Sequence, residues 1–311
     1  MSGSLTDRCV GRWPELLTML GVDGRYLNGK HGPCPVCQQG KDRFRFDDKA
    51  GRGSWICSTC GAGDGFALAM KINGWDFKEV AERVEGVVGK IPQAAPAKER
   101  SEQALKDAMN RLWTTSIRVQ SGDIVDRYLT GRGILLDQWP VSLRRLDQCR
   151  YQGDGEPTWH PAMIAKVQGL DGKPVTLHRT YLDELGRKAD VASPRRLMPG
   201  KIDKGCAIRL AEAGPIMGIA EGIETALSAS IIWSVPCWAA VSAGMLMAWE
   251  PPAETKEIII FGDNDPGFAG QSAAFGLAHK LSARGLKVRV EMPTDAGLDW
   301  NDVLQAERVT A

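Results

Sequence analysis

Four cysteines in two close pairs constrain this chain most. Cys34 and Cys37 form one C-x2-C pair, and Cys57 and Cys60 form a second pair after nineteen intervening residues. Each pair places two thiolates on one tight turn, and two such turns supply the tetrahedral ligands of a closed structural zinc site. We therefore predict a zinc-binding β-ribbon near the N-terminus. His31 is an alternative ligand, although four thiolates already fill the coordination shell.

The other four cysteines are scattered, and we expect them to be small buried hydrophobic residues: Cys9, Cys149, Cys206 and Cys237. The chain has no run of 18 or more uncharged apolar residues, and its start has neither an apolar signal segment nor a small-residue cleavage site. These absences argue against a membrane or secreted protein. We therefore expect a cytoplasmic protein with reduced thiols.

The segment between the two cysteine pairs alternates basic and aromatic residues, as Arg43-Phe44-Arg45-Phe46. In a strand this alternation puts the arginines on one face and the phenylalanines on the other. One interpretation is structural, with the phenylalanines packing a small core and the arginines solvated. The other is functional: Arg43 and Arg45, with Trp55 nearby, contact phosphates and stack on bases of single-stranded nucleic acid.

A length of 311 residues favours at least two domains. We expect a zinc-binding domain over 1–89, a linker over 90–101, a basic subdomain of helices and a β-meander over 102–210, and an α/β domain over 211–311. The linker prediction rests on two prolines and three alanines without a periodic apolar face. Residues 1–210 carry 33 Lys and Arg against 25 Asp and Glu, whereas residues 211–311 carry 6 against 13. The basic N-terminal part is suited to binding a polyanion, and the acidic C-terminal part can place carboxylates around cations.

The apolar patterns predict α+β structure in the middle and a parallel sheet at the end. A helical pattern runs from Glu102 to Leu129 and ends at Gly131, and short strands follow between 160 and 200. Strands and helices then alternate, with strands over 216–220, 237–241, 258–261 and 288–292 and helices over 224–233 and 267–283. This alternation predicts a small doubly wound α/β domain with a mostly parallel sheet. The expected fold class is therefore α/β plus a zinc ribbon.

Carboxylates follow several of these strands. They are Glu221 and Glu224 after the first, Asp263 and Asp265 after the third, and Asp299 and Asp302 after the last. Ligands of an open parallel sheet bind beyond the carboxyl ends of its strands. Crowded carboxylates there favour Mg²⁺, and paired metal ions support in-line attack at phosphorus. The alternative is that these acids only cap helices, above all Asp265 and Asp299.

These residues resemble a known family. Three segments resemble the acidic motifs of the Toprim domain: Glu221-Gly222-Ile223-Glu224, Asp263-Asn264-Asp265-Pro266-Gly267 and Asp299-Trp300-Asn301-Asp302. Residues 31–65 are similar to the zinc-binding domain of phage and plasmid primases. The segment around Tyr128 and the meander containing His160 and His178 resemble the same group.

The resemblance implies a DNA primase that makes short RNA primers on single-stranded DNA. It implies that Glu221, Asp263 and Asp265 are catalytic ligands of Mg²⁺ or Mn²⁺. It adds Glu224, Asp299 and Asp302 as accessory acids, with Glu224 standing where many primases have aspartate, and Arg179 and Lys188 as basic groups of the template channel. The expected partners are single-stranded DNA, nucleoside triphosphates and a separate replicative helicase, because no P-loop motif and no fused helicase accompany the Toprim motifs.

Two other functions fit the same residues. A Toprim nuclease would use the same metal site to cleave nucleic acid. A non-catalytic zinc adaptor would bind nucleic acid through the cysteine-rich domain and load another replication protein, and its acidic residues would bind no metal.

Overall fold

The computed structural model describes residues 4–310 except 41, 94–100, 154 and 201. The chain divides into two compact units, residues 1–99 and 100–311. Residues 94–100 of the predicted linker lie outside the described residues. At the start of that linker, Ile91 is buried and the side-chain amide of Gln93 donates to the carbonyl of Val10 at 3.0 Å. Packing of the N-terminal unit therefore extends past residue 89.

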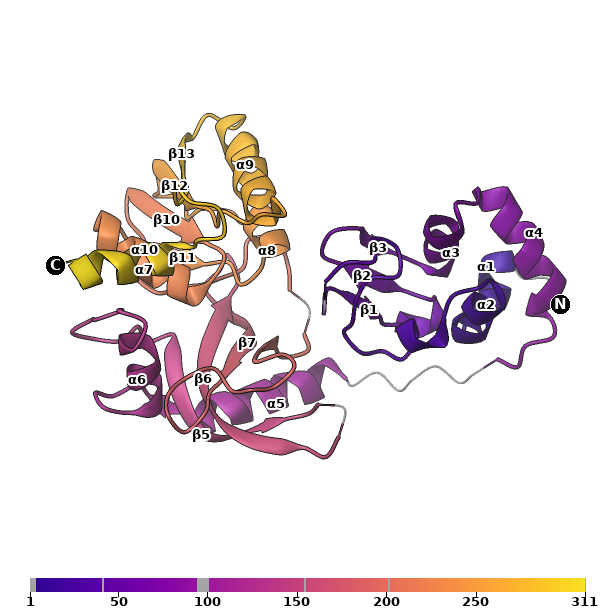
Figure 1. The fold of residues 1–311 in the computed structure, drawn as a ribbon, viewed down its shortest axis with the longest axis horizontal. Coiled ribbons are helices and arrows are strands. Elements are labelled where there is room, and N and C mark those ends of the chain that lie inside the picture. The colour runs from indigo at the N-terminus through magenta and orange to yellow at the C-terminus, as the bar shows by residue number, and fades with distance from the viewer. Residues whose placement is uncertain (1–3, 41, 94–100, 154, 201, 311) are drawn as a thin grey trace. The chain divides into compact units, whose positions relative to one another are not determined.

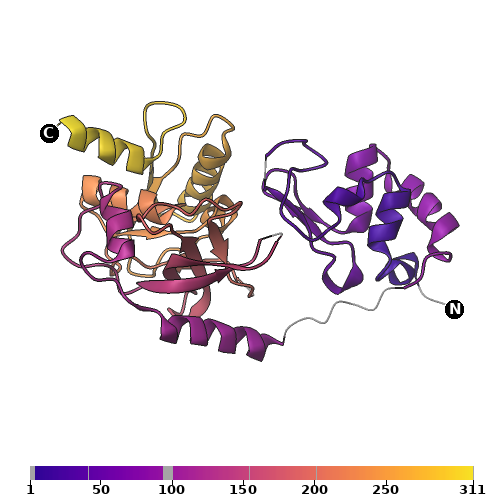
Figure 2. The ribbon, with the colours of Figure 1, turned by 60° about the horizontal axis from the view of Figure 1, so that its bottom comes forward.

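The N-terminal unit combines a small antiparallel sheet with short helices (Figures 1 and 2). Its strands are β1 (Phe44–Phe46), β2 (Trp55–Cys57) and β3 (Gly61–Gly63), in that order. Its α-helices are α1 (Leu5–Cys9), α2 (Trp13–Met19), α3 (Gly65–Asn73) and α4 (Phe77–Val88). Single 3-10 turns, η1 (Gly24–Tyr26) and η2 (Lys49–Gly51), lie between them.

Helix α4 begins with a capping box. Asp76 accepts a hydrogen bond from the backbone of Glu79, and the Glu79 side chain accepts one from the backbone of Asp76. This reciprocal capping box satisfies two backbone N–H groups that a helix start leaves without partners. The helix then buries Val80, Val84 and Val88 against the same core as the ribbon.

The ribbon contributes its apolar face to this core. Phe44 and Phe46 are buried while Arg45 between them is not, which confirms the predicted alternation. Trp13 of α2 and Trp55 of β2 are buried in the same cluster. The ribbon is therefore packed on a helical layer.

The second unit begins with two helices. They are α5 (Glu102–Thr115) and α6 (Ile124–Thr130), separated by the short strand β4 (Ile117–Arg118). The prediction of one continuous helix from Glu102 to Leu129 is therefore wrong. Gly122 adopts a positive φ of 81°, and the Asp123 side chain caps a new helix by accepting from the backbone of Val125 and Asp126. Glycine followed by aspartate is a start signal that outweighs the apolar spacing.

One mixed sheet runs through the rest of the second unit. Its first strands are the antiparallel β5 (Leu143–Tyr151), β6 (Thr158–Gln168), β7 (Pro174–Tyr181), β8 (Arg195–Leu197) and β9 (Ala207–Ile208). The following strands are β10 (Ile216–Ala220), β11 (Cys237–Ala239), β12 (Glu257–Phe261) and β13 (Lys287–Glu291). Among the described residues, the strand order is β13-β12-β10-β11-β9-β6-β5-β4, with β7 and β8 branching from β6. The predicted boundary at residue 210 thus falls within a continuous sheet.

The C-terminal part of this sheet is doubly wound, as predicted. Strand β10 pairs in parallel with β11 and β12, and β12 pairs in parallel with β13. Its helices are α7 (Ile223–Trp233), α8 (Ala243–Met247), α9 (Ala269–Ser282) and α10 (Trp300–Thr310). Ile259 and Phe261 of β12 pack in one cluster with α7 and α10, whereas Ile258 and Ile260 pack in another with α8 and α9. Helices therefore cover both faces, as Figure 1 shows. No helix in the described ranges combines the length and apolar character needed to cross a bilayer.

Candidate metal sites

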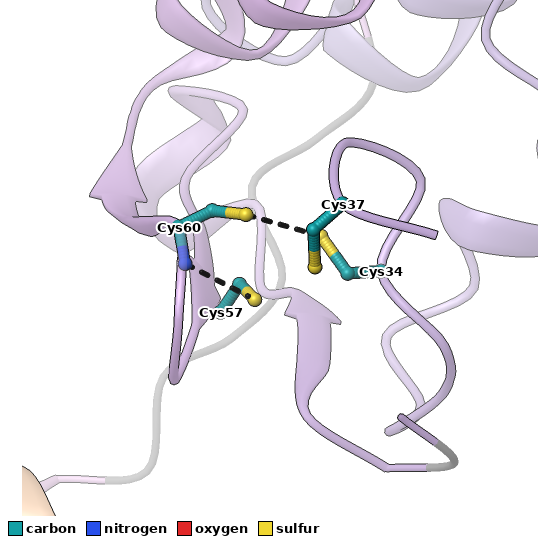
Figure 3. Close-up of side chains that lie close together, drawn as sticks. All are labelled: Cys34, Cys37, Cys57 and Cys60. Carbon is teal, nitrogen blue, oxygen red and sulfur yellow. Dashed lines mark hydrogen bonds between the residues drawn. The ribbon is translucent and has the colours of Figure 1, made fainter. Parts of the chain in front are cut away.

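The four paired cysteines meet in the N-terminal unit. The Sγ atoms of Cys34, Cys37, Cys57 and Cys60 all lie within 4.8 Å of one another (Figure 3). All four are free thiols. Cys57 ends β2 and Cys60 precedes β3, so the β2–β3 hairpin supplies one pair and a loop before β1 supplies the other. Four convergent thiols fit the tetrahedral coordination that Zn²⁺ prefers, and the four cysteines form a zinc-ribbon site.

Backbone groups support these thiols. The N–H of Val36 lies 3.4 Å from Cys34 Sγ, and the N–H of Cys60 lies 3.4 Å from Cys57 Sγ. Hydrogen bonds of this kind stabilise negative charge on a thiolate. The scattered cysteines are buried, as expected of small hydrophobic residues: Cys9, Cys149, Cys206 and Cys237.

His31 lies outside the thiol cluster and is held by other groups. Its Nδ1 lies 2.9 Å from the carbonyl oxygen of Asp42, and its Nε2 lies 3.2 Å from Nη1 of Arg45. Arg45 also pairs with the carboxylate of Asp47. The alternative of His31 as a zinc ligand therefore has no support in the geometry.

Among the ribbon residues predicted to contact nucleic acid, the two arginines are accessible and Trp55 is not. Arg43 donates to the Thr59 hydroxyl at 2.9 Å and, like Arg45, remains partly exposed. Trp55, however, is only 2% exposed, stacks on Phe44 with ring centroids 6.0 Å apart and donates its indole N–H to the carbonyl of Asp64. The prediction that Trp55 stacks on bases is wrong, because the indole is enclosed in the core of the unit.

Acidic residues follow two adjacent strands of the second unit. In the β10–β12 register Ala220 lies opposite Phe261, so Glu221 and Asp263 leave the sheet at the same edge. We call Glu221, Asp263, Asp265 and Asp299 the acidic rim, because the charges of the other three acids act on the carboxyl group of Asp263. Burial, with the charges of Glu221, Asp299 and Asp265 as smaller causes, raises the pKa of Asp263 to about 7. Burial and the charge of Asp265 also raise the pKa of Glu221.

One oxygen of this rim has no partner. Asp263 Oδ1 is buried and accepts no hydrogen bond from the described residues. A buried carboxylate oxygen without a donor is unfavourable, and further negative charges nearby increase the penalty. A divalent cation would relieve both, so the donor set fits Mg²⁺ or Mn²⁺, which bind carboxylate oxygens. Within the described part of the chain the rim oxygens are not as tightly gathered as the four sulfurs.

Asp265 caps a helix as well. Its Oδ2 accepts from the backbone N–H of Gly270 at 2.9 Å, in the first turn of α9. A Cβ atom on Gly270 would lie only 2.5 Å from the carbonyl oxygen of Asp263, so glycine is required for the helix start to approach this loop. Because the cap uses one carboxylate oxygen, capping by Oδ2 is compatible with a cation on Oδ1.

Asp299 and Asp302 form the cap of α10. Asp299 Oδ1 accepts from the backbone of Asn301 at 2.7 Å and of Asp302 at 3.0 Å, and Asp302 Oδ2 accepts from the backbone of Asp299 at 2.9 Å. This is the capping alternative that the sequence left open. Asp299 nevertheless contributes to the raised pKa of Asp263, which places its charge at the rim.

Glu224 is engaged differently from the rim acids. It is buried, accepts a hydrogen bond from the Tyr128 hydroxyl and lies 3.8 Å from Lys188 Nζ. Burial raises its pKa, but the charges of Lys188 and Arg195, together with hydrogen bonds from Tyr128 and the backbone, outweigh burial, and the net shift is downward. The contacts of Glu224 therefore place this expected accessory acid in a buried ion pair with Lys188. Lys188, which was predicted to line the template channel, is the basic partner in this ion pair.

Two neighbouring basic groups complete this region. Arg179 lies on β7, where its Nη2 donates to the carbonyl of Leu197 at 3.3 Å and its guanidinium lies 5.7 Å from the Tyr181 ring. Arg195 on β8 is exposed, and its charge lowers the pKa of both Glu221 and Asp263. Sequence reasoning missed Arg195, because only strand pairing shows which arginine of the meander faces the acids. The doublet Arg195-Arg196 was the available signal.

Family models match three segments of the chain. Residues 29–66 match the zinc-binding domain of primase-helicase, residues 103–210 match a domain of unknown function, DUF7146, and residues 216–308 match the Toprim domain.

Solved structures of primases are similar at low identity. The zinc-binding and RNA polymerase domains of Aquifex aeolicus primase are 15% identical with a TM-score of 0.44, over 100% of this chain and 84% of that one. The primase fragment of the bacteriophage T7 primase-helicase is 18% identical with a TM-score of 0.41, over 89% of this chain and 94% of that one. The domain assignment rests on the family models. The chain therefore combines an N-terminal zinc-binding domain of the primase-helicase type with a C-terminal Toprim domain.

Proposed function

We propose that this protein is a DNA primase that synthesises short RNA primers on single-stranded DNA by metal-dependent nucleotidyl transfer. The observation that carries the proposal is the acidic rim, in which Asp263 has a raised pKa and a buried oxygen without a partner among the described residues. Such a site is suited to divalent cations. The two matched domain types, a primase-helicase zinc-binding domain and a Toprim domain, support the same function.

In this proposal Glu221, Asp263 and Asp265 hold Mg²⁺ or Mn²⁺. When bound, such ions neutralise a triphosphate and activate a 3′-hydroxyl for in-line attack. Asp265 holds its place because its Oδ2 is bonded to the start of α9, which leaves little freedom for rotation. Arg195 offers a positive charge beside the rim, suited to the phosphates of a nucleotide.

The remaining groups support the site. The Glu224–Lys188 pair, together with Tyr128, ties α6 and the meander to the first helix of the Toprim domain. The zinc ribbon presents Arg43 and Arg45 as partly exposed groups for phosphates of the template. The proposed partners are single-stranded DNA, nucleoside triphosphates and a separate helicase.

De novo synthesis on random single-stranded DNA with labelled nucleotides tests the function. Asp263→Asn and Asp265→Asn remove one charge each while keeping the side-chain shape, and in Asp265→Asn the new amide still offers an oxygen to the backbone of Gly270. We expect each variant to lose at least about 100-fold in synthesis while keeping zinc. Asp171→Asn, in the exposed turn between β6 and β7, is the matched control and should retain activity.

The same preparations separate the competing functions. Mg²⁺-dependent shortening of labelled single-stranded DNA, without synthesis, would assign a nuclease. Failure of the rim to bind Mn²⁺ in a titration, with nucleic-acid binding preserved, would assign an adaptor. Synthesis that survives both substitutions would refute the proposed metal ligands.

A further inference from the structure

Phe268 is an exposed aromatic residue with an unfavourable backbone. It precedes α9 directly, the residue is 69% exposed, and its φ is 59°. The left-handed region is rare for a bulky residue, because its Cβ crowds the backbone there. Glycine adopts this conformation freely. Because Phe268 is exposed, packing in a core does not explain why a phenylalanine occupies this position.

The surrounding hydrogen bonds hold Phe268 in this conformation. Its N–H donates to the carbonyl of Asp265 at 3.0 Å, and its own carbonyl accepts from Ser272 at 3.0 Å. The Gln271 side chain donates to the carbonyl of Asp265 and to Oδ1 of Asn264, each at 2.9 Å. Strained residues persist where their surroundings fix them in this way, and they are concentrated at functional sites.

Phe268 lies beside the acidic rim. Gly270, two residues later, approaches Asp263 so closely that a Cβ atom would lie 2.5 Å from the Asp263 carbonyl oxygen and 3.1 Å from Asp265 Oδ2. The first turn of α9 is therefore packed against the loop that bears both carboxylates. The backbone N–H of Phe268 is bonded to Asp265 of that same loop, so an exposed aromatic residue is anchored to the loop that bears the rim carboxylates.

We propose that the Phe268 ring is a stacking platform for an unstacked nucleobase at the acidic rim. The inference rests on the proposed function and adds a base-binding residue to it. An aromatic face stacks on any base, and its contribution does not require burial in the free protein. The base can belong to a single strand or to a free nucleotide, and two arms of one experiment distinguish these sources.

The test uses the 311-residue chain with three variants. Phe268→Gly removes the ring and relieves the backbone strain, and Phe268→Trp restores an aromatic face. Phe275→Ala is the matched control, because Phe275 lies on the same helix, is 57% exposed and is outside the strained cap. Binding is measured with a single-stranded oligonucleotide that contains 2-aminopurine and, separately, with etheno-ATP in the presence of Mn²⁺.

We expect Phe268→Gly to weaken binding about 5- to 100-fold in at least one arm, with loss of the fluorescence change caused by stacking. Its melting temperature should equal or exceed that of the wild type, because strain is removed. Phe268→Trp should bind like the wild type, and so should Phe275→Ala. The arm that loses affinity identifies the source of the base.

Unchanged binding by Phe268→Gly in both arms would overturn the inference, as would a lowered melting temperature, which would indicate a structural role. An equal loss in Phe275→Ala would also overturn it, since the loss would then not be specific to the ring at position 268. Ring-dependent binding without primer synthesis by the wild type would refute the primase and leave the platform standing. Primer synthesis by the wild type without ring-dependent binding would refute the stacking platform and leave the primase standing.

Discussion

The zinc ribbon and the acidic rim are both suited to metal ions, but they are built in different ways. The ribbon brings four thiols within 4.8 Å from two turns that are close in the sequence. The rim draws carboxylates from the ends of two strands and the start of α10, and their charges contribute to the raised pKa of Asp263. The ribbon ligands thus converge locally, whereas the rim acids are held together by a surrounding fold that opposes their repulsion.

This comparison predicts that the two units depend on metal differently. Removal of zinc by a chelator, or Cys57→Ser, should abolish the melting transition of the N-terminal unit and leave that of the second unit in place. The physical reason is that structural zinc contributes about 10–16 kcal/mol of binding free energy to folding in small domains. Calorimetry with a parallel zinc assay measures both transitions. Cys206→Ala, in the second unit, should retain zinc, and an N-terminal transition that is insensitive to chelation would contradict the comparison.

Within the second unit, Glu224 and Asp263 should respond oppositely to loss of charge. Glu224→Gln leaves Lys188 without its partner, and a buried charge without a partner is destabilising. Because the Lys188 side chain is 32% exposed and regains some water, we expect a loss of about 2 kcal/mol in the free energy of unfolding. Urea unfolding measures it, and a variant as stable as the wild type would contradict the assigned ion pair.

Asp263→Asn should stabilise the protein without divalent metal, by on the order of 2 kcal/mol at pH 8. The folded pKa of Asp263 is raised to about 7, so ionisation favours the unfolded state as the pH rises. The advantage of the variant should be full above pH 7, shrink as the pH falls and vanish near pH 4. Mn²⁺ should stabilise the wild type more than the variant. Equal free energies of unfolding for the wild type and Asp263→Asn at pH 8 would show that the ionised carboxylate of Asp263 does not destabilise the fold.

The smallest predicted effect concerns His178, which is buried beside Glu224. Burial is the main cause that lowers its pKa to about 4, and its Nδ1 has no partner among the described residues. Below pH 6.5 the unfolded chain binds a proton that the folded chain does not, so stability falls as the pH falls from 6.5 towards 4. Relative to His178→Asn, the wild type should lose about 1 kcal/mol between pH 7.5 and 5.5. Parallel pH profiles of the two proteins would contradict the assignment.

Local signals in the sequence predicted much of the architecture. The spacing of Cys34 through Cys60 predicted the zinc ribbon. The strand over 216–220 was predicted with its observed bounds, because a short apolar run bounded by turn residues is a local pattern. The helix over 102–129 was wrong where Gly122 and Asp123 start a new helix, a signal that occupies two residues within a long apolar pattern.

The sequence determined which residue types follow which strands, because strand alternation and cysteine spacing depend on near neighbours. The tertiary structure alone decided what each side chain faces. It buried Trp55 in the core, paired Glu224 with Lys188 instead of the rim, and placed Arg195 near the carboxylates. The physical reason is that burial and charge interactions depend on distances between segments far apart in the chain, which the pairing of strands and helices fixes only on folding.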